Sequence, residues 1–317
     1  MTIRRFAVLL ALVLLLAGGL GLRAWTARAL ADAPTLSLIV PTGASLPGVA
    51  HRLEATHLVG NARLFTLAVR ALGTAKPIRA GEYAVPSGAG WREILQLLQS
   101  GRVIQHLVTI PEGLPSVLVA QRLAAEPLLI GPVPTPPEGH VLPDTYAFQR
   151  GETRAAVLAR MTGAMDRTLA QLWPGRSPAA PVRSREEALI LASIIEKETA
   201  LAPERRQVAG VYANRLRAGM KLDADPTVIY PITQGRPLGR PIRQSDLHAD
   251  TGYNTYLKPG LPRGPIANPG RLSLAAALDP APTPALYFVA NGRGGHVFAA
   301  TLAEQARNVA KWRALGH

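Results

Sequence analysis

The sequence predicts an α+β protein with a small amino-terminal module and a larger carboxyl-terminal domain. Strand-like and helical segments do not alternate regularly and no internal repeat is present, which disfavours a doubly wound sheet and a solenoid. Two proline-rich connections, at 127–139 and 174–181, interrupt the middle of the chain. A chain of 317 residues can bury a substantial core and is long enough for more than one compact unit.

An apolar leader opens the chain. Residues 6–22 carry no charge, and Arg4, Arg5 and Arg23 flank them. The run is near the lower limit of the roughly 20 residues that a membrane-spanning helix needs. We expect an uncleaved anchor, with the amino terminus inside, the rest of the chain exported and Trp25 at the interface. A signal peptide cleaved near the Ala-Leu-Ala of 29–31 is the alternative.

The elements that follow are predicted from hydrophobic periodicity. In the first module we expect strands at 36–40 and 81–85 and helices at 44–56, 62–72 and 91–99. Further along we expect a strand and turn at 106–113, a helix at 153–172, a helix at 184–199 with a second helix after it, a strand at 285–290 and a last helix at 302–315. Long loops that contain Gly and Pro separate the later elements.

Charge and composition exclude several classes of function. The net charge of +14 favours a polyanionic or anionic-membrane neighbour. Basic residues are spread without a run of five or a nucleic-acid motif, so we expect no nucleic-acid partner. Cysteine is absent, and no histidine pair has metal-ligand spacing, so we expect no metal. Phosphate-binding, dinucleotide and serine-hydrolase motifs are also missing, and no cofactor is expected.

The helix at 184–199 ends in the most informative residue, Glu198. Ser184 and Glu187 form a capping-box pattern at its start. At about 100° per residue, the apolar arc of Leu191, Ile194 and Ile195 lies on the side of Glu198, while Glu196 points to the opposite side. Burial against that arc disfavours the anion and raises the pKa toward neutrality, as a general acid requires. The alternative is that both glutamates are solvated at a helix end.

A group of polar side chains follows this helix. Amide, hydroxyl and aromatic groups on loops are typical of sugar recognition, because sugar hydroxyls need directional partners and sugar faces pack on rings. The alternative is that these residues form turns, caps and core contacts. The candidates are Asp223, Asp225, Tyr253, Asn254, Tyr256 and His296.

Several segments together resemble one family. LASIIEKET, NRLRAGMKLDADPTVIY, YNTYLKPGLPRGPIANPG and LYFVANGRGGHVF occur in that order, and TIPEG and HVLPDTYAF precede them. This series resembles the endolytic murein transglycosylases, also called YceG-like. Arg263 departs from the pattern, because the family usually has proline at that position of the GLPRG segment.

The resemblance implies an organisation and an activity. It implies a membrane anchor and stalk at 1–30, a LysM-like module at 31–104 and a catalytic domain at 105–317. The implied activity is non-hydrolytic cleavage of peptidoglycan strands between N-acetylmuramic acid and N-acetylglucosamine, which leaves 1,6-anhydro ends. The implied location is the inner membrane, crossed once, with the catalytic domain on the periplasmic side. The implied partners are glycan strands, membrane lipid and cell-wall synthases.

The resemblance also bears on the site residues. The EKET motif contains two acids, and we choose Glu198 as the catalytic acid and base, with Glu196 as second choice. Thr199 follows Glu198 as a hydroxyl follows the catalytic glutamate in other lytic transglycosylases. Asp225, Asn254 and Tyr256 are the expected substrate-positioning residues. Two other functions stay open: a catalytically idle peptidoglycan-binding scaffold, and a hydrolytic muramidase that uses Asp225 as a second carboxylate.

Overall fold

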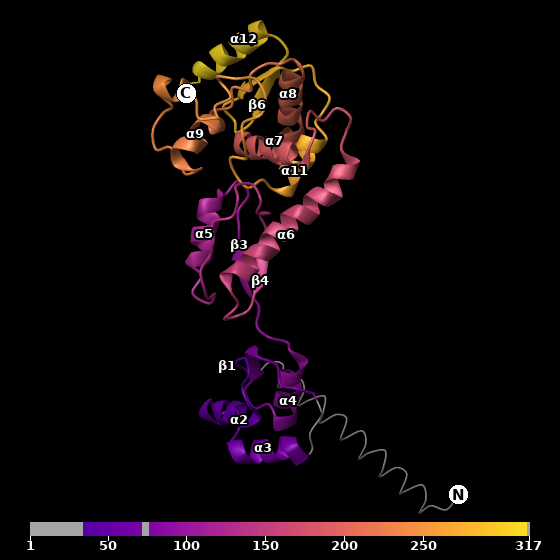
Figure 1. The fold of residues 1–317 in the computed structure, drawn as a ribbon, viewed down its shortest axis with the longest axis vertical. Coiled ribbons are helices and arrows are strands. Elements are labelled where there is room, and N and C mark those ends of the chain that lie inside the picture. Colours follow the sequence, from indigo (N-terminus) through magenta and orange to yellow (C-terminus); the bar gives the residue numbers. More distant parts are fainter. Residues whose placement is uncertain (1–33, 72–75, 316–317) are drawn as a thin grey trace, which may run out of the picture. The chain divides into compact units, whose positions relative to one another are not determined.

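The computed structural model describes residues 34–71 and 76–315, and it confirms the predicted α+β class. The chain divides into two compact units, Met1–His106 and Leu107–His317. Within the described residues, no helix is both long enough and apolar enough to cross a membrane. The anchor predicted at 6–22 lies outside the described residues. Figure 1 shows the elements of both units.

In its described residues, the first unit contains one antiparallel pair of strands and three helices. Strand β1 (Thr35–Val40) pairs antiparallel with β2 (Gly81–Pro86), so that Leu38 faces Tyr83. Helices α2 (Leu46–Ala55), α3 (Ala62–Ala71) and α4 (Trp91–Ser100) complete the unit. Alternate strand residues and one stripe of each helix form its core, which includes Leu38, Tyr83, Leu53, Phe65 and Leu98. All five elements were predicted from periodicity.

The second unit begins with a small layer of strand and helix. Strand β3 (His106–Thr109) pairs with β4 (Thr145–Phe148), next to helix α5 (Ser116–Ala124) and the start of the long helix α6 (Arg154–Leu172). These elements share a hydrophobic cluster that includes Val108, Val119, Phe148 and Met161. A 3₁₀ turn, η1 (Trp173–Gly175), ends α6.

A second cluster surrounds helix α7 (Arg185–Glu198). This helix packs against α8 (Arg205–Arg217) and α11 (Arg271–Leu278), and residues 188–195 are all buried. A helix that is apolar on all sides is expected in a protein interior. The remaining elements are η2 (Ala202–Glu204), α9 (Asp225–Thr233), α10 (Gln244–Leu247), the antiparallel pair β5 (Tyr287–Ala290) and β6 (His296–Ala299), and α12 (Leu302–Arg313).

In the described residues, six helices and strands were not predicted from the sequence patterns: α5, β4, α9, α10, α11 and β6. The 3₁₀ turns η1 and η2 were not predicted either. Helix α9 was expected to be a loop because it contains Pro226 and Pro231. Pro226 lies in the first turn, where a missing N–H costs nothing, and Pro231 lies near the end. Helix α11 is only eight residues long and mostly apolar, so the segment is too short to show a helical alternation of apolar and polar residues.

Candidate active site

Helix α7 places its last residue at the edge of a small cleft. The Ser184 hydroxyl accepts a hydrogen bond from the Glu187 N–H at 3.1 Å and starts the helix, as predicted. The reciprocal bond of a capping box is not made to Ser184, because the Glu187 carboxylate accepts instead from the Arg183 N–H at 2.6 Å. Thr199 has extended backbone angles, so the helix ends directly after Glu198.

Glu198 is a partly exposed carboxyl group whose main partner is a buried tyrosine. The Tyr212 hydroxyl, on α8, donates to Glu198 Oε1 at 2.9 Å. The pKa of Glu198 is raised to about 7, mainly by burial and in smaller part by nearby Asp225, against the opposing effects of the Tyr212 hydrogen bond and of Arg215. Near neutral pH this carboxyl group therefore exists in both its protonated and its ionised form.

The side chain of Glu198 lies in a cleft of about 170 Å³, here called the acid cleft. Its surface is mostly polar, which suits a ligand rich in hydroxyl groups. The residues that line it are Glu198, Tyr212, Arg215, Leu222, Asp223, Asp225, Tyr256 and Phe288. Two sequence-predicted residues, Asp225 and Tyr256, are thus brought together with Glu198.

Asp225 and Tyr256 form a hydrogen-bonded pair on one wall of the acid cleft. The Tyr256 hydroxyl donates to Asp225 Oδ1 at 2.5 Å. Burial and this carboxylate both raise the pKa of Tyr256, so it stays a neutral donor. Two buried threonines fix the pair, because Thr227 Oγ1 lies 2.9 Å from Thr255 Oγ1 and the latter accepts from the backbone N–H that precedes Asp225. The start of α9 is therefore held next to Tyr256.

Arg215 also lines the acid cleft and connects several of its segments. Its guanidinium donates to the Leu222 carbonyl at 2.9 Å and the Leu286 carbonyl at 2.6 Å, and it forms an ion pair with Asp223 at 3.1 Å. Asp223 has a φ of 49°, a left-handed conformation that aspartate tolerates better than most residues. Arg215 thus ties α8 to the loop before α9 and to β5, and it adds positive charge beside Glu198.

Glu196 has different surroundings. Its side chain is only 5% exposed, and Oε1 lies 3.2 Å from Arg205 Nη2. Oε2 accepts from the Gly270 N–H at 2.9 Å and the Ser273 hydroxyl at 2.7 Å, at the start of α11. The Glu112 side chain occupies the space where a Cβ at position 270 would lie, so any larger residue there would have to displace Glu112. Glu196 joins α7 to α8 and α11, and the alternative in which both glutamates are solvated is wrong.

Asn254 does not line the acid cleft, and its side chain is used within the fold. It is buried, and its amide donates to the carbonyls of Leu247 at 2.9 Å and Ala249 at 3.1 Å. Its carbonyl accepts from the Tyr256 N–H at 3.0 Å. The structure thus places Asn254 where it orients the backbone of Tyr256 and away from the lining of the cleft.

The other candidate polar residues also have partners inside the fold. The Tyr253 ring packs on Tyr230, with ring centres 5.0 Å apart, and the guanidinium of Arg263 lies 4.6 Å from its centre. His296 Nδ1 lies 2.8 Å from Glu204, which also accepts from the Thr199 hydroxyl at 3.3 Å. Thr199 therefore bonds to Glu204, and its hydroxyl is not a partner of Glu198.

Sequence reasoning missed Tyr212 and Arg215. They lie three residues apart on α8 and so share one face of that helix. The available signal was an aromatic hydroxyl and an arginine at this spacing in an otherwise apolar stretch, directly after the glutamate helix. In residues 34–71 and 76–315 no three His, Asp or Glu side chains gather so as to hold a metal ion.

This arrangement can move a proton in both directions. A carboxyl group with a pKa of about 7 can donate a proton to a bound leaving group and then accept one from a nearby hydroxyl. The polar wall formed by Asp225 and Tyr256 can bind hydroxyl groups next to it. The site thus has the parts for acid and base catalysis by one residue.

Comparisons with known proteins identify relatives that align along most of the chain. An endolytic murein transglycosylase of Bacillus subtilis is 28% identical over 310 residues, which cover 88% of this chain and 85% of the relative. A protein of the same name from Streptococcus pneumoniae D39 is 26% identical over 325 residues, and the chain spans only 57% of its length. The crystal structure of a YceG-like protein from Listeria monocytogenes aligns with a TM-score of 0.54 at 28% identity and covers 87% of this chain and 99% of that one. The model of the YceG-like family matches residues 38–311, and the chain therefore belongs to the YceG-like family.

Proposed function

We propose that the protein is an endolytic murein transglycosylase that cuts peptidoglycan strands between N-acetylmuramic acid and N-acetylglucosamine. The observation that carries the proposal is the carboxyl group of Glu198, whose pKa is raised to about 7 at the edge of a polar cleft. Relatives that align along most of the chain and bear this name support it.

One residue performs both proton transfers. Protonated Glu198 gives its proton to the glycosidic oxygen, and the bond from C1 of the muramoyl residue to that oxygen breaks. The positive charge that develops at C1 is of the oxocarbenium type. The Glu198 carboxylate then takes the proton from the C6 hydroxyl, whose oxygen closes onto C1 as a 1,6-anhydro ring. The acid is regenerated and no water is consumed.

The neighbours of Glu198 have supporting roles in this proposal. Tyr212 orients the carboxyl group by donating to one of its oxygens, which leaves the other free to face the sugar. Asp225 and Tyr256 hold substrate hydroxyls on the wall of the acid cleft. Asn254, predicted as a substrate-binding residue, acts indirectly by holding the backbone of Tyr256. Glu196 is a structural residue in this proposal.

The organisation outside the catalytic domain is also part of the proposal. The apolar run at 6–22 anchors the chain in the inner membrane by a single crossing, and the catalytic domain lies on the periplasmic side. The LysM-like module of 31–104 holds glycan near the site where strands are made, beside the cell-wall synthases. The net charge of +14 supports contact with an anionic lipid surface.

Product analysis tests the reaction. Purified glycan strands are incubated with the protein, and the fragments are analysed by mass spectrometry. We expect anhydro ends, which are lighter than reducing ends by one water, and their loss on Glu198→Gln. Reducing ends would identify a hydrolase, for which Asp225 in the same cleft is the available second carboxylate. Unchanged glycan would identify a binding scaffold.

A further inference from the structure

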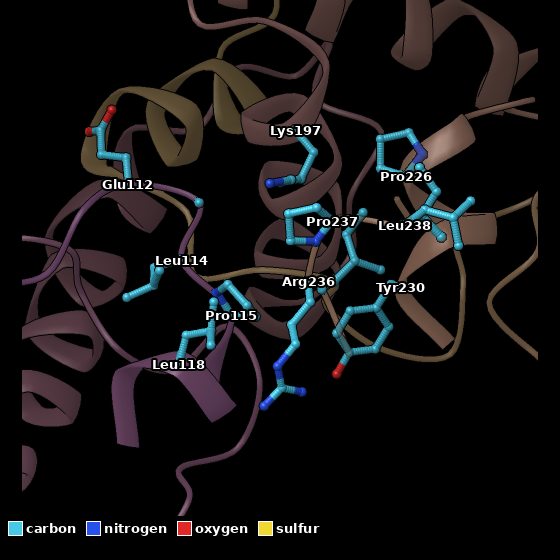
Figure 2. A pocket seen from close by; sticks show the side chains of 14 residues that line it. Glu112, Leu114, Pro115, Leu118, Lys197, Pro226, Tyr230, Arg236, Pro237 and Leu238 are labelled. Atoms are coloured by element: carbon cyan, nitrogen blue, oxygen red, sulfur yellow. The ribbon is translucent and has the colours of Figure 1, made fainter. Parts of the chain in front are cut away.

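A second cavity of the same unit lies beside the acid cleft. It encloses about 410 Å³, within the range of small-molecule sites, and is here called the side cavity. Its walls come from the loop after β3, the end of α7, α9 and the loop that follows α9 (Figure 2). None of the proposed catalytic residues lines it.

The two hollows are neighbours along two separate walls. Lys197 lines the side cavity and Glu198 lines the acid cleft, while Pro226 lines the side cavity and Asp225 the acid cleft. Consecutive Cα atoms are about 3.8 Å apart, and side chains at consecutive helix positions point about 100° apart, so the two hollows lie on adjacent faces of the same two helix turns. A ligand that crosses the last turn of α7 and the first turn of α9 can occupy both.

The side cavity combines an apolar surface with two cations. Most of its lining is apolar, including Leu114, Leu118 and Ile266. Lys197 and Arg236 add positive charge, and their side chains are drawn in Figure 2. Within the part of the chain that the structure describes, neither the Lys197 ammonium nor the Arg236 guanidinium has a hydrogen-bond or ion-pair partner.

The acidic residue of the lining does not neutralise these cations. Glu112 is paired with Arg205, whose Nη2 lies 3.0 Å from its carboxylate, and Arg205 also contacts Glu196. The hydroxyl of Tyr230, another lining residue, forms a hydrogen bond with the carboxyl group of Glu138. Lys197 and Arg236 therefore give the cavity a net positive charge, which complements an anionic ligand.

We propose that the side cavity binds the carboxylate-bearing peptide that branches from the muramoyl residue of the strand being cut, an inference that rests on the proposed murein substrate. While the peptide is attached, the lactyl group of the muramoyl residue is an amide, so the sugars of the strand carry no charge and give two cations nothing to pair with. A short peptide of alanine and acidic residues has both an apolar part for the cavity surface and carboxylates for Lys197 and Arg236. The cavity then selects strands that still carry peptides and aligns them over Glu198.

Two preparations of the same strands test the proposal. One keeps its peptides. In the other an amidase has removed them and the freed lactyl carboxylates have been converted to amides, so that the bare strands carry no charge. We expect the ratio of kcat/KM on peptide-bearing strands to kcat/KM on bare strands to fall about tenfold in Lys197→Gln/Arg236→Gln, through a higher KM on the peptide-bearing strands. Lys311→Gln, which removes an exposed cation on α12, is the matched control and should keep the wild-type ratio. An unchanged ratio in the double variant, or equal losses on both substrates, would overturn the proposal.

Binding without cleavage separates this inference from the proposed reaction. An N-acetylmuramoyl peptide is titrated into the Glu198→Gln protein by calorimetry, and its analogue with every carboxylate converted to an amide serves as the second probe. We expect about tenfold weaker binding of the amide, and a similar loss for the free acid when Lys197 and Arg236 are also changed to Gln. Equal affinities of acid and amide would overturn the side-cavity proposal even if anhydro products form. If the acid binds more tightly than the amide but the wild-type protein yields no anhydro products, only the proposed reaction is contradicted.

Discussion

Glu196 and Glu198 lie two positions apart in the last turn of α7, yet their surroundings have little in common. Arg205, the Gly270 N–H and the Ser273 hydroxyl all contact the Glu196 carboxylate. Glu198 has one hydrogen bond, from Tyr212, and otherwise faces apolar burial and the acid cleft. A buried carboxylate with several hydrogen-bond donors is stabilised as the anion and can connect parts of the fold. A buried carboxyl group with few donors has a raised pKa, which favours proton transfer near neutral pH.

The difference teaches that position on the helix matters more than residue type. The side of Glu196 meets α8 and the start of α11, where a cation and free N–H groups compensate its negative charge. The side of Glu198 meets Tyr212 and the cleft, where burial is the main cause that raises the pKa and Asp225 adds to it. Predictions that exchange or remove these environments therefore test the comparison directly.

The largest expected effect is on cleavage. Glu198→Gln removes the transferable proton, and we expect kcat to fall at least about 10³-fold, since a positioned acid and base contributes roughly 10² to 10⁴ for a single transfer. Glu196→Gln, assayed well below its unfolding temperature, should lose no more than about tenfold. Rates of anhydro-end formation measured by chromatography check both. A Glu196→Gln protein that is folded and inactive would reverse the assignment.

The same two variants should also differ in stability, with Glu196→Gln less stable than wild type and Glu198→Gln more stable at high pH. Glu196→Gln leaves buried Arg205 with a weakened partner, and we expect a loss of about 3 kcal/mol in the free energy of unfolding. The folded-state pKa of Glu198 is about 7 against an ordinary value of 4.5, so ionising it costs folding free energy above pH 7 and nothing below pH 4.5.

Glu198→Gln should therefore stabilise the protein at pH 8, by about 2 kcal/mol once the partial exposure of the group is considered, and should have little effect at pH 4. Urea unfolding at the two pH values measures the change. The contrast between the two glutamates would be broken by a Glu198→Gln protein that is less stable than wild type at pH 8.

The surroundings of Glu198 were predicted from the sequence better than the surroundings of Glu196. Helix α7 and both of its ends follow from local patterns, and the apolar arc next to Glu198 explains its raised pKa. The partners of Glu196 at Gly270 and Ser273 lie 74 and 77 residues away, on a helix that was not predicted. Local periodicity carries no information on such contacts. The side of α7 opposite Glu198 faces protein and not solvent, because residues 188–195 are buried on all sides of the helix.

The loop candidates show the same limit. Asp225, Asn254 and Tyr256 were grouped because they share polar segments, and the structure brings Asp225 and Tyr256 into the cleft. Nothing local in the sequence separates Asn254 from Tyr256, because the distinction depends on which backbone carbonyls surround the amide. Asp225 is positioned by the hydrogen bond between the backbone before α9 and Thr255. This contact could not be predicted, because the two prolines of α9 made the segment look like a loop.

Asn254 and Tyr256 repeat the contrast of the two glutamates, with a smaller expected effect. Asn254→Ala leaves buried carbonyls without donors and should cost about 2 kcal/mol of unfolding free energy. Tyr256→Phe keeps the ring and removes one hydroxyl from the cleft wall, so we expect kcat/KM to fall about fivefold with little change in stability. Thermal unfolding and strand cleavage, measured on both proteins, check the pair. A stable Asn254→Ala protein with a strongly raised KM would place the amide in contact with substrate after all.

The smallest expected effect concerns the hydrogen bond that Glu198 does have. The cleavage rate should fall as pH rises through about 7, because Glu198 must start protonated. The Tyr212 hydroxyl stabilises the carboxylate and lowers that pKa, so Tyr212→Phe should move the falling limb to higher pH, by less than about one unit for the loss of one hydrogen bond. The measurement is the pH dependence of cleavage, with each protein normalised to its own plateau, and Phe keeps the edge contact with Phe288. A falling limb that moves to lower pH in Tyr212→Phe would show that the titrating acid is not the one that Tyr212 contacts. The same conclusion would follow if the limb stays in place in Tyr212→Phe and disappears in Glu196→Gln.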